Sequence, residues 1–279
     1  MLAIKELLLS TPLVESHLKK TRIPPSFFLL GFQKCGTTSL YRYISQQVGF
    51  APAKQKEVDT MTDGSYSLGK FLSYFPKKSE GSFTGNASHM MSFVPGGLDY
   101  LQQEFPEAKL LAVVRNPIER AFSHYNYDKA SADDPKRRTM NIPNSFDEAV
   151  AQELELLESI DDYQDLSRIY ALTSEQNGYG MPISRGLYYY YLNDFAQQGL
   201  EVLTLSIEEI EADFELRFSQ ILTHIGIDKE QHVIPKPKRF NAAQKELAMS
   251  ENTRTLLNKF FKPHNEKLYE FLGRDLAWN

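Results

Sequence analysis

A glycine-containing turn followed by hydroxyl side chains is the part of this chain best suited to chemistry. The segment 31–39 reads GFQKCGTTS, and the apolar run 27–32 that leads into it predicts a buried strand. The hydroxyl residues predict the beginning of a helix that runs to about residue 48. Free N–H groups and the helix dipole favour a phosphate at such a helix start. The stretch therefore predicts a P-loop-like anion-binding turn, with these phosphate-binding candidates: Lys34, Cys35, Gly36, Thr37, Thr38 and Ser39.

The position of the lysine separates this turn from the common NTP-binding loop. That loop places a lysine directly after its second glycine. Here Thr37 occupies that position and the lysine comes earlier, as Lys34. The turn therefore predicts a nucleotide bound in a different manner from that of the ATPases.

A second predicted strand, over 109–115, ends in a cation. An NTPase would place an aspartate near the end of such a strand to hold magnesium. This strand ends in Arg115, and Asn116 and Pro117 then suit the cap and first position of a helix. An arginine here predicts a second anionic group on the ligand, and no metal.

Together the two motifs resemble those of the sulfotransferase family that uses 3′-phosphoadenosine 5′-phosphosulfate (PAPS). Lys34, Gly36, Thr37 and Thr38 match the family's 5′-phosphosulfate loop. The segment 115–123, RNPIERAFS, matches the loop that holds the 3′-phosphate. The resemblance assigns Arg115 and Ser123 to the 3′-phosphate and Lys34 to the charge that develops on the bridging oxygen.

Further matches extend the resemblance along nearly the whole chain, toward the heparan-type and bacterial sulfotransferases. Lys56-Glu57-Val58 is similar to a segment whose glutamate is the proposed general base, so Glu57 inherits that role. Tyr188 lies in a segment similar to the family's Gly-x-Tyr helix start. Lys238 and Arg239 resemble a late loop that grips the nucleotide.

The chain departs from the heparan-type pattern near the acceptor. Asp59-Thr60-Met61 replaces His-Phe-Phe, and Ala87 stands where that branch has a second active-site lysine. The acceptor hydroxyl or amine is therefore open between a small molecule, a glycan, a lipid and a carrier-bound acyl chain. His89 and His124 compete with Glu57 for the role of base.

Two other functions fit parts of the pattern. A P-loop-type kinase or NTPase would need magnesium-dependent ATP turnover, and Thr37 and Arg115 disfavour it. A non-catalytic nucleotide- or glycan-binding module would be expected to lose Lys34 or Glu57, and this chain keeps both.

Composition limits the partners. A net charge of −5 disfavours a general attraction to nucleic acid or anionic membranes, although a local basic pocket is compatible with it. Cys35 is the single cysteine, which excludes an intramolecular disulfide. No apolar run approaches the roughly 20 residues of a membrane span, so we expect a cytoplasmic location. The oligomeric state is open.

The order of predicted elements gives the fold class. Strands are predicted over 27–32, 55–61, 82–87, 109–115 and 202–206, with helices between them. Alternation of this kind predicts an α/β fold: a doubly wound, mostly parallel sheet with helices on both faces. We expect one domain over 1–279, with 1–25 as an N-terminal helical extension. Capping boxes at Ser145 and Ser206 predict helix starts, and the last helix is expected to be interrupted near Pro263 and to stop at Gly273.

Overall fold

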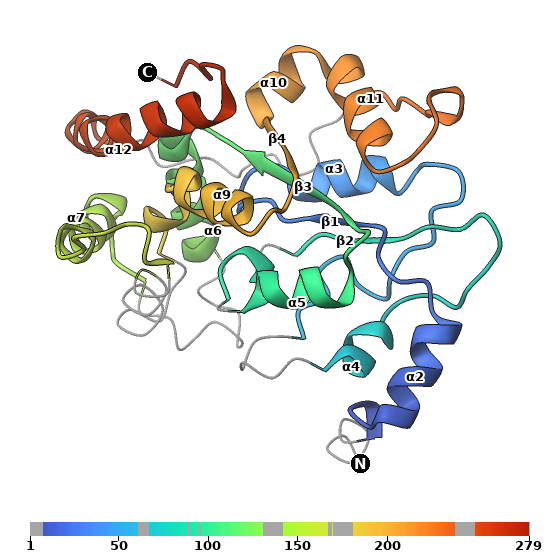
Figure 1. Ribbon diagram of the computed structural model, residues 1–279. Helices are drawn as coiled ribbons and strands as arrows, with labels where there is room; N and C mark the ends of the chain where they lie inside the picture. Colours follow the sequence, from blue (N-terminus) through green and yellow to red (C-terminus); the bar gives the residue numbers. More distant parts are fainter. Residues whose placement is uncertain are drawn as a thin grey trace.

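A four-stranded parallel sheet organises the molecule. We describe the chain from a computed structural model, over residues 8–60, 67–88, 90–94, 96–130, 142–166, 169, 181–237 and 249–278. The strands are β1 (Phe27–Leu29), β2 (Gly85–Asn86), β3 (Lys109–Val114) and β4 (Val202–Ser206). Their order is β2-β1-β3-β4, with every neighbouring pair parallel. The predicted parallel α/β sheet is confirmed (Figure 1).

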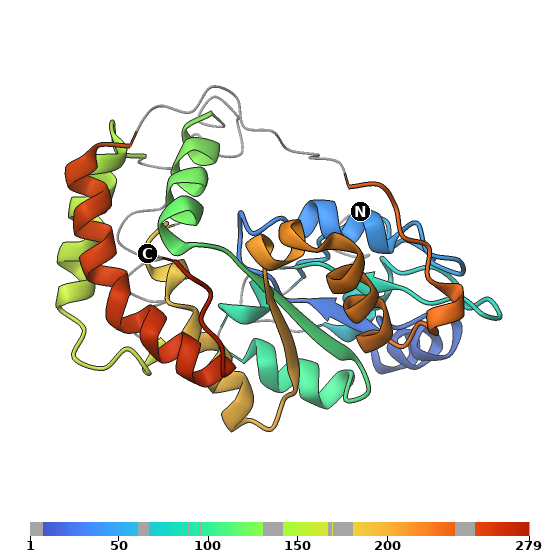
Figure 2. The same cartoon turned by 90° about the horizontal axis from the view of Figure 1, so that it is seen from above.

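Helices cover both sides of this sheet. In Figure 2, α5 (Gly97–Glu104) and α9 (Tyr188–Gln197) lie on one side, and α3 (Thr37–Ile44) lies on the other. Beyond the carboxyl end of β3 the chain gathers α6 (Pro117–Ala130), α7 (Phe146–Glu158) and α12 (Glu251–Leu272). The remaining α-helices are α2 (Pro12–Thr21), α4 (Leu68–Leu72), α10 (Ile207–Ala212) and α11 (Phe214–His224). No helix in the described ranges is long and apolar enough to cross a bilayer.

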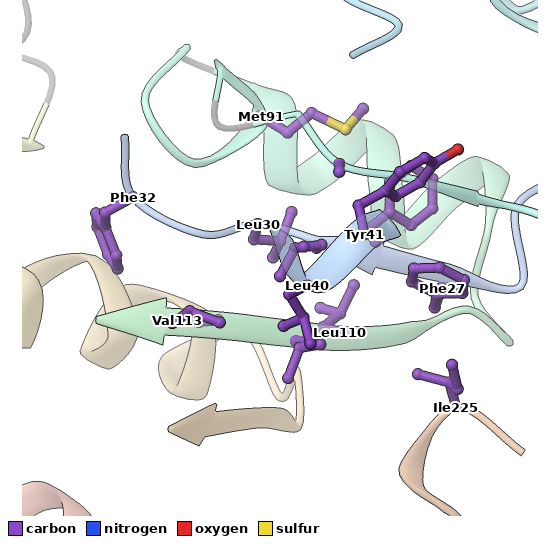
Figure 3. Close-up of a cluster of buried hydrophobic side chains, with 14 of the residues drawn as sticks. Phe27, Leu30, Phe32, Leu40, Tyr41, Met91, Leu110, Val113 and Ile225 are labelled. Atoms are coloured by element: carbon purple, nitrogen blue, oxygen red, sulfur yellow. The ribbon is translucent and has the colours of Figure 1, made fainter. Parts of the chain in front are cut away.

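Two apolar clusters hold these layers together. The larger one surrounds the sheet and includes Phe27, Leu110 and Val113 together with Leu40 of α3 (Figure 3). The smaller one joins α6, α7, α9 and α12 around residues such as Tyr125. The larger cluster thus stabilises the sheet, and the smaller one stabilises the helical group beyond the carboxyl end of β3.

The segment before β2 differs from prediction. We expected a strand over 55–61, but its described part, 55–60, forms none. The side chain of Asn86 accepts from Val58 N at 2.9 Å and donates to Val58 O at 3.3 Å. A side-chain amide therefore replaces the strand partner that the backbone of Val58 would otherwise need.

Two helix predictions also change. The helix expected from Ser206 to about residue 225 is divided at Asp213, whose carboxylate accepts from Leu216 N at 3.1 Å and caps α11. Helix α12 is not interrupted: Pro263 lies inside it, and it continues to its predicted end at Gly273. Leu257 and Leu268 are buried on either side of the proline, so packing holds both halves despite the lost backbone hydrogen bond.

Candidate active site

The anion turn between β1 and α3 has a strained, closely packed backbone. Lys34 has a φ of 71° and Gly36 a φ of 79°. The positive φ at Gly36 is a conformation that strains residues with a side chain, so this position favours glycine. Lys34 carries a side chain in a left-handed conformation, which costs energy and is typical of functional turns.

The beginning of α3 is open to a ligand. The first helical bond is donated by Leu40 N to Gly36 O at 3.1 Å, and no side-chain hydrogen bond caps the helix. The N–H groups of Thr37, Thr38 and Ser39 have no acceptor in the part of the chain that the structure describes. Three N–H donors at the positive end of a helix dipole can bind an anion.

Two arginines from the next strand and helix hold the turn by its carbonyl groups. Arg115 donates to Lys34 O, and Arg120 donates to Gln33 O, each at 3.3 Å. Arg120 is fully buried. These two hydrogen bonds fix the backbone of the turn. The bond from Arg115 also joins the two predicted phosphate motifs directly.

Tyr188 and Cys35 lie beneath this junction. The Tyr188 hydroxyl donates to Arg115 O at 2.8 Å and lies 3.9 Å from the Cys35 Sγ. Burial raises the pKa of the Cys35 thiol to about 12. The thiol is therefore protonated near neutral pH, which makes Cys35 a packing residue of the turn and a poor nucleophile.

Helix α6 begins where the sequence predicts. The Asn116 carboxamide accepts from Ile118 N at 3.0 Å and caps the helix. Ser123 is half-buried further along α6, and no hydrogen bond joins it to Arg115 among the described residues. His124 is buried, with Nδ1 3.4 Å from Arg120 Nη1 and Nε2 3.3 Å from Asp128 Oδ2. Its surroundings are those of an internal polar network.

The ammonium group of Lys34 extends toward α6. Its Nζ lies 4.2 Å from the centre of the Tyr127 ring, in a cation–π contact. Tyr127 is exposed. The lysine side chain thus extends from the turn to an exposed ring of α6.

The Lys56-Glu57 segment comes next to the anion turn. Lys56 Nζ donates to Thr38 Oγ1 at 3.0 Å and lies 2.5 Å from Glu57 Oε1. The ammonium group of Lys56 therefore connects Thr38, a predicted phosphate ligand, with Glu57, the predicted base.

Asp59 is a site candidate that the sequence reasoning did not select. Its carboxylate accepts a hydrogen bond from the Ser88 hydroxyl. Burial raises the pKa of Asp59 above its ordinary value, and the hydrogen bond from Ser88 opposes that shift. The sequence does contain one signal for it: Asp59 is a second carboxylate only two positions after Glu57, the predicted base.

Three predicted residues cannot be placed. His89, Lys238 and Arg239 lie outside the described residues. Within the described ranges, no group of three or more His, Cys, Asp or Glu side chains is arranged to hold a metal ion.

Comparison with known proteins agrees with these motifs. The chain is 24% identical to carbohydrate sulfotransferase 15 from Mus musculus, over 93% of this chain and 55% of that protein. It spans 55–66% of the length of the curated relatives that match nearly all of it. A crystal structure of a sulfotransferase from Alicyclobacillus acidocaldarius superimposes with a TM-score of 0.63 at 26% identity, over 92% of this chain and 99% of that one. A mouse sulfotransferase complexed with PAP shares the fold, with a TM-score of 0.51 at 17% identity over 94% of this chain and 91% of that one. The sulfotransferase domain model matches residues 24–267, and the chain therefore belongs to the sulfotransferase domain family.

Proposed function

We propose that this protein transfers a sulfuryl group from PAPS to a hydroxyl or amine of a carbohydrate acceptor. The observation that carries the proposal is the bond from Arg115 to Lys34 O. It joins a second cationic side chain to a turn whose helix N–H groups have no acceptor among the described residues. A ligand with phosphate groups at two positions fits such a pair. Arg115 also stands where an NTPase would place a metal-binding carboxylate.

The residues present fit this nucleotide. The N–H groups of Thr37, Thr38 and Ser39, at the positive end of α3, would hold the 5′-phosphosulfate. Arg115 and Ser123 would hold the 3′-phosphate, and the planar guanidinium suits a phosphate group. Tyr188 supports Arg115 from below through its backbone carbonyl.

Bound PAPS supplies an activated sulfuryl group whose bond to the bridging oxygen breaks as the acceptor attacks sulfur. The chain then has two tasks. Glu57 accepts the acceptor proton, and Lys34 stabilises the negative charge that the bridging oxygen gains with the bonding electron pair.

The carbohydrate acceptor is supported by the names of the relatives, which include carbohydrate and heparan sulfate sulfotransferases. Ala87, in place of a lysine of the heparan-type branch, favours an acceptor other than heparan sulfate. The cytoplasmic location expected from the sequence stays a prediction.

Transfer of radiolabelled sulfate from PAPS tests this function directly. The acceptor panel would contain neutral oligosaccharides, heparan sulfate, a hydroxylated lipid and a hydroxyacyl carrier protein. Label on an oligosaccharide supports the proposal. Label on the lipid or carrier only would overturn the carbohydrate acceptor, and ATP turnover with magnesium and no sulfate transfer would overturn the whole function.

A further inference from the structure

We propose that Lys56 supplies a second cation at the sulfuryl-transfer centre, in addition to Lys34. This inference rests on the proposed function. It assigns to Lys56 the charge that is absent at Ala87, the residue that follows β2.

The position of Lys56 carries the proposal. Its side chain is 22% exposed, and its ammonium group lies against Thr38, in the first turn of α3, instead of extending into solvent. An exposed ion pair with Glu57 alone would be weak and would not fix a long side chain at the turn. The contact with Thr38 places the charge beside the N–H groups that would hold the phosphosulfate.

The backbone around Lys56 is fixed from the Ala87 side. Ala87 N donates to Lys56 O at 3.2 Å, and the Asn86 side chain binds both backbone groups of Val58. Ala87 is 2% exposed. The backbone of Lys56 is therefore bonded directly to Ala87, and its side chain reaches the anion turn.

The hydrogen bonds of Lys56 leave one donor for the reaction. An ammonium group has three N–H donors. Among the described residues, Thr38 and Glu57 accept two of them. When the sulfur–oxygen bond breaks and its electron pair moves to the bridging oxygen, the third N–H can donate to that oxygen, while the acceptor proton moves to the carboxylate.

The first experiment compares Lys56→Ala with Lys54→Ala. Lys54 is a matched control because it lies on the same segment but donates to Ser73 O at 2.7 Å, away from the turn. For Lys56→Ala we expect kcat for labelled sulfate transfer to fall about 10²-fold, because charge stabilisation is lost mainly in the transition state. The increase in melting temperature caused by PAP (adenosine 3′,5′-bisphosphate, which is PAPS without its sulfuryl group) should be retained. Lys54→Ala should keep both values.

The second experiment separates charge from packing. In Lys56→Cys, alkylation with 2-bromoethylamine restores an ammonium group on a side chain of nearly the original length, whereas iodoacetamide adds a neutral amide. Cys35 is buried, and burial raises the pKa of its thiol to about 12, so the wild-type protein should be insensitive to both reagents. We expect 2-bromoethylamine to recover most of the lost rate and iodoacetamide to recover none.

The outcomes distinguish this inference from the function on which it rests. Wild-type kcat in Lys56→Ala, or equal recovery with the neutral reagent, overturns the role of Lys56 and leaves the sulfotransferase function intact. A wild-type protein that neither transfers label nor gains stability from PAP overturns both.

Discussion

Two carboxylates follow Lys56 in the sequence, those of Glu57 and Asp59, and they compete for the role of base. Glu57 is the choice favoured by the family resemblance, and its carboxylate lies 2.5 Å from the Lys56 ammonium. Asp59 is bound by Ser88, and burial raises its pKa toward the range in which a carboxylate is an effective base. The positions of the two carboxylates do not show which one is the base, so we compare variants in which each is replaced by its isosteric amide.

We predict that Glu57→Gln lowers kcat about 10²–10⁴-fold, because the amide cannot accept the acceptor proton. Affinity for PAP, measured by calorimetry, should change little. Asp59→Asn is the matched variant and should retain most of the activity. The reverse pattern, with loss in Asp59→Asn and retention in Glu57→Gln, would move the base to Asp59.

We predict that Lys34→Ala lowers the transfer rate about 10²-fold or more, because one charge-stabilising group is removed from the anion turn. Tyr127→Leu is a useful comparison, since it removes the ring beneath the ammonium group and leaves the charge. Turnover of Lys34→Ala at the wild-type rate would exclude this lysine from the mechanism.

At the scale of elements, a buried carboxylate joins α7 to the chain that leads into α9. Glu153 accepts from Ile183 N and from Ser184 N, each at 2.7 Å. The residue is fully buried, and this burial raises its pKa to about 7. The connection that positions Tyr188 therefore depends on a group that titrates near neutral pH.

Glu153 predicts a specific pH dependence of stability. The unfolded state loses this proton near the ordinary value of 4.5, whereas the folded state keeps it until about pH 7. The free energy of unfolding should therefore fall between these values as the pH rises, by on the order of 3 kcal/mol from this group. Denaturant titrations across this range would measure the slope.

Glu153→Gln provides the comparison. Below about pH 5 it should be less stable than the wild type, because its amide NH₂ faces one of the two N–H donors, and it should lose this part of the slope. Glu155→Gln, at an exposed position of the same helix, should behave like the wild type. An unchanged slope in Glu153→Gln would contradict the assignment.

Local signals predicted most elements, and tertiary contacts decided the rest. The capping motifs at Ser145 and Ser206 mark real helix starts, because each serine accepts from the N–H three residues later. The full reciprocal box forms at Ser206, whereas Glu148 accepts from Asn144 N instead of from Ser145 N. The strand expected over 55–61 fails because the Asn86 side chain binds Val58. No periodicity of the local sequence reports a hydrogen bond to a residue so distant in the chain.

At the scale of the whole molecule, we predict that PAP raises the melting temperature more than AMP at equal concentration. A ligand that binds only the folded state stabilises it by mass action, and AMP lacks the 3′-phosphate that Arg115 would hold. Thermal unfolding followed by fluorescence is sufficient. Equal shifts with both nucleotides would remove Arg115 from nucleotide recognition.

The sequence also predicted that the turn after β1 and Arg115 after β3 would lie at one edge of the sheet, because the two strands are parallel neighbours. It could not predict that Lys56 would bind Thr38, which depends on how the segment before β2 crosses the turn. Asp59 was missed for the same reason, because its burial and its partner Ser88 arise only on folding.

The bond from Arg115 to Lys34 O makes the two ends of the nucleotide site thermodynamically dependent on each other. A 3′-phosphate that binds the Arg115 guanidinium binds the same group that donates to Lys34 O and fixes the backbone of the turn. Recognition of the two phosphate groups should then be cooperative: the 3′-phosphate should add less affinity when the turn is altered. Arg115→Ala should therefore also weaken the binding of AMP, which lacks the 3′-phosphate, because the mutation releases the backbone of the turn that would hold the 5′-phosphate. Independent contacts would leave the affinity for AMP unchanged.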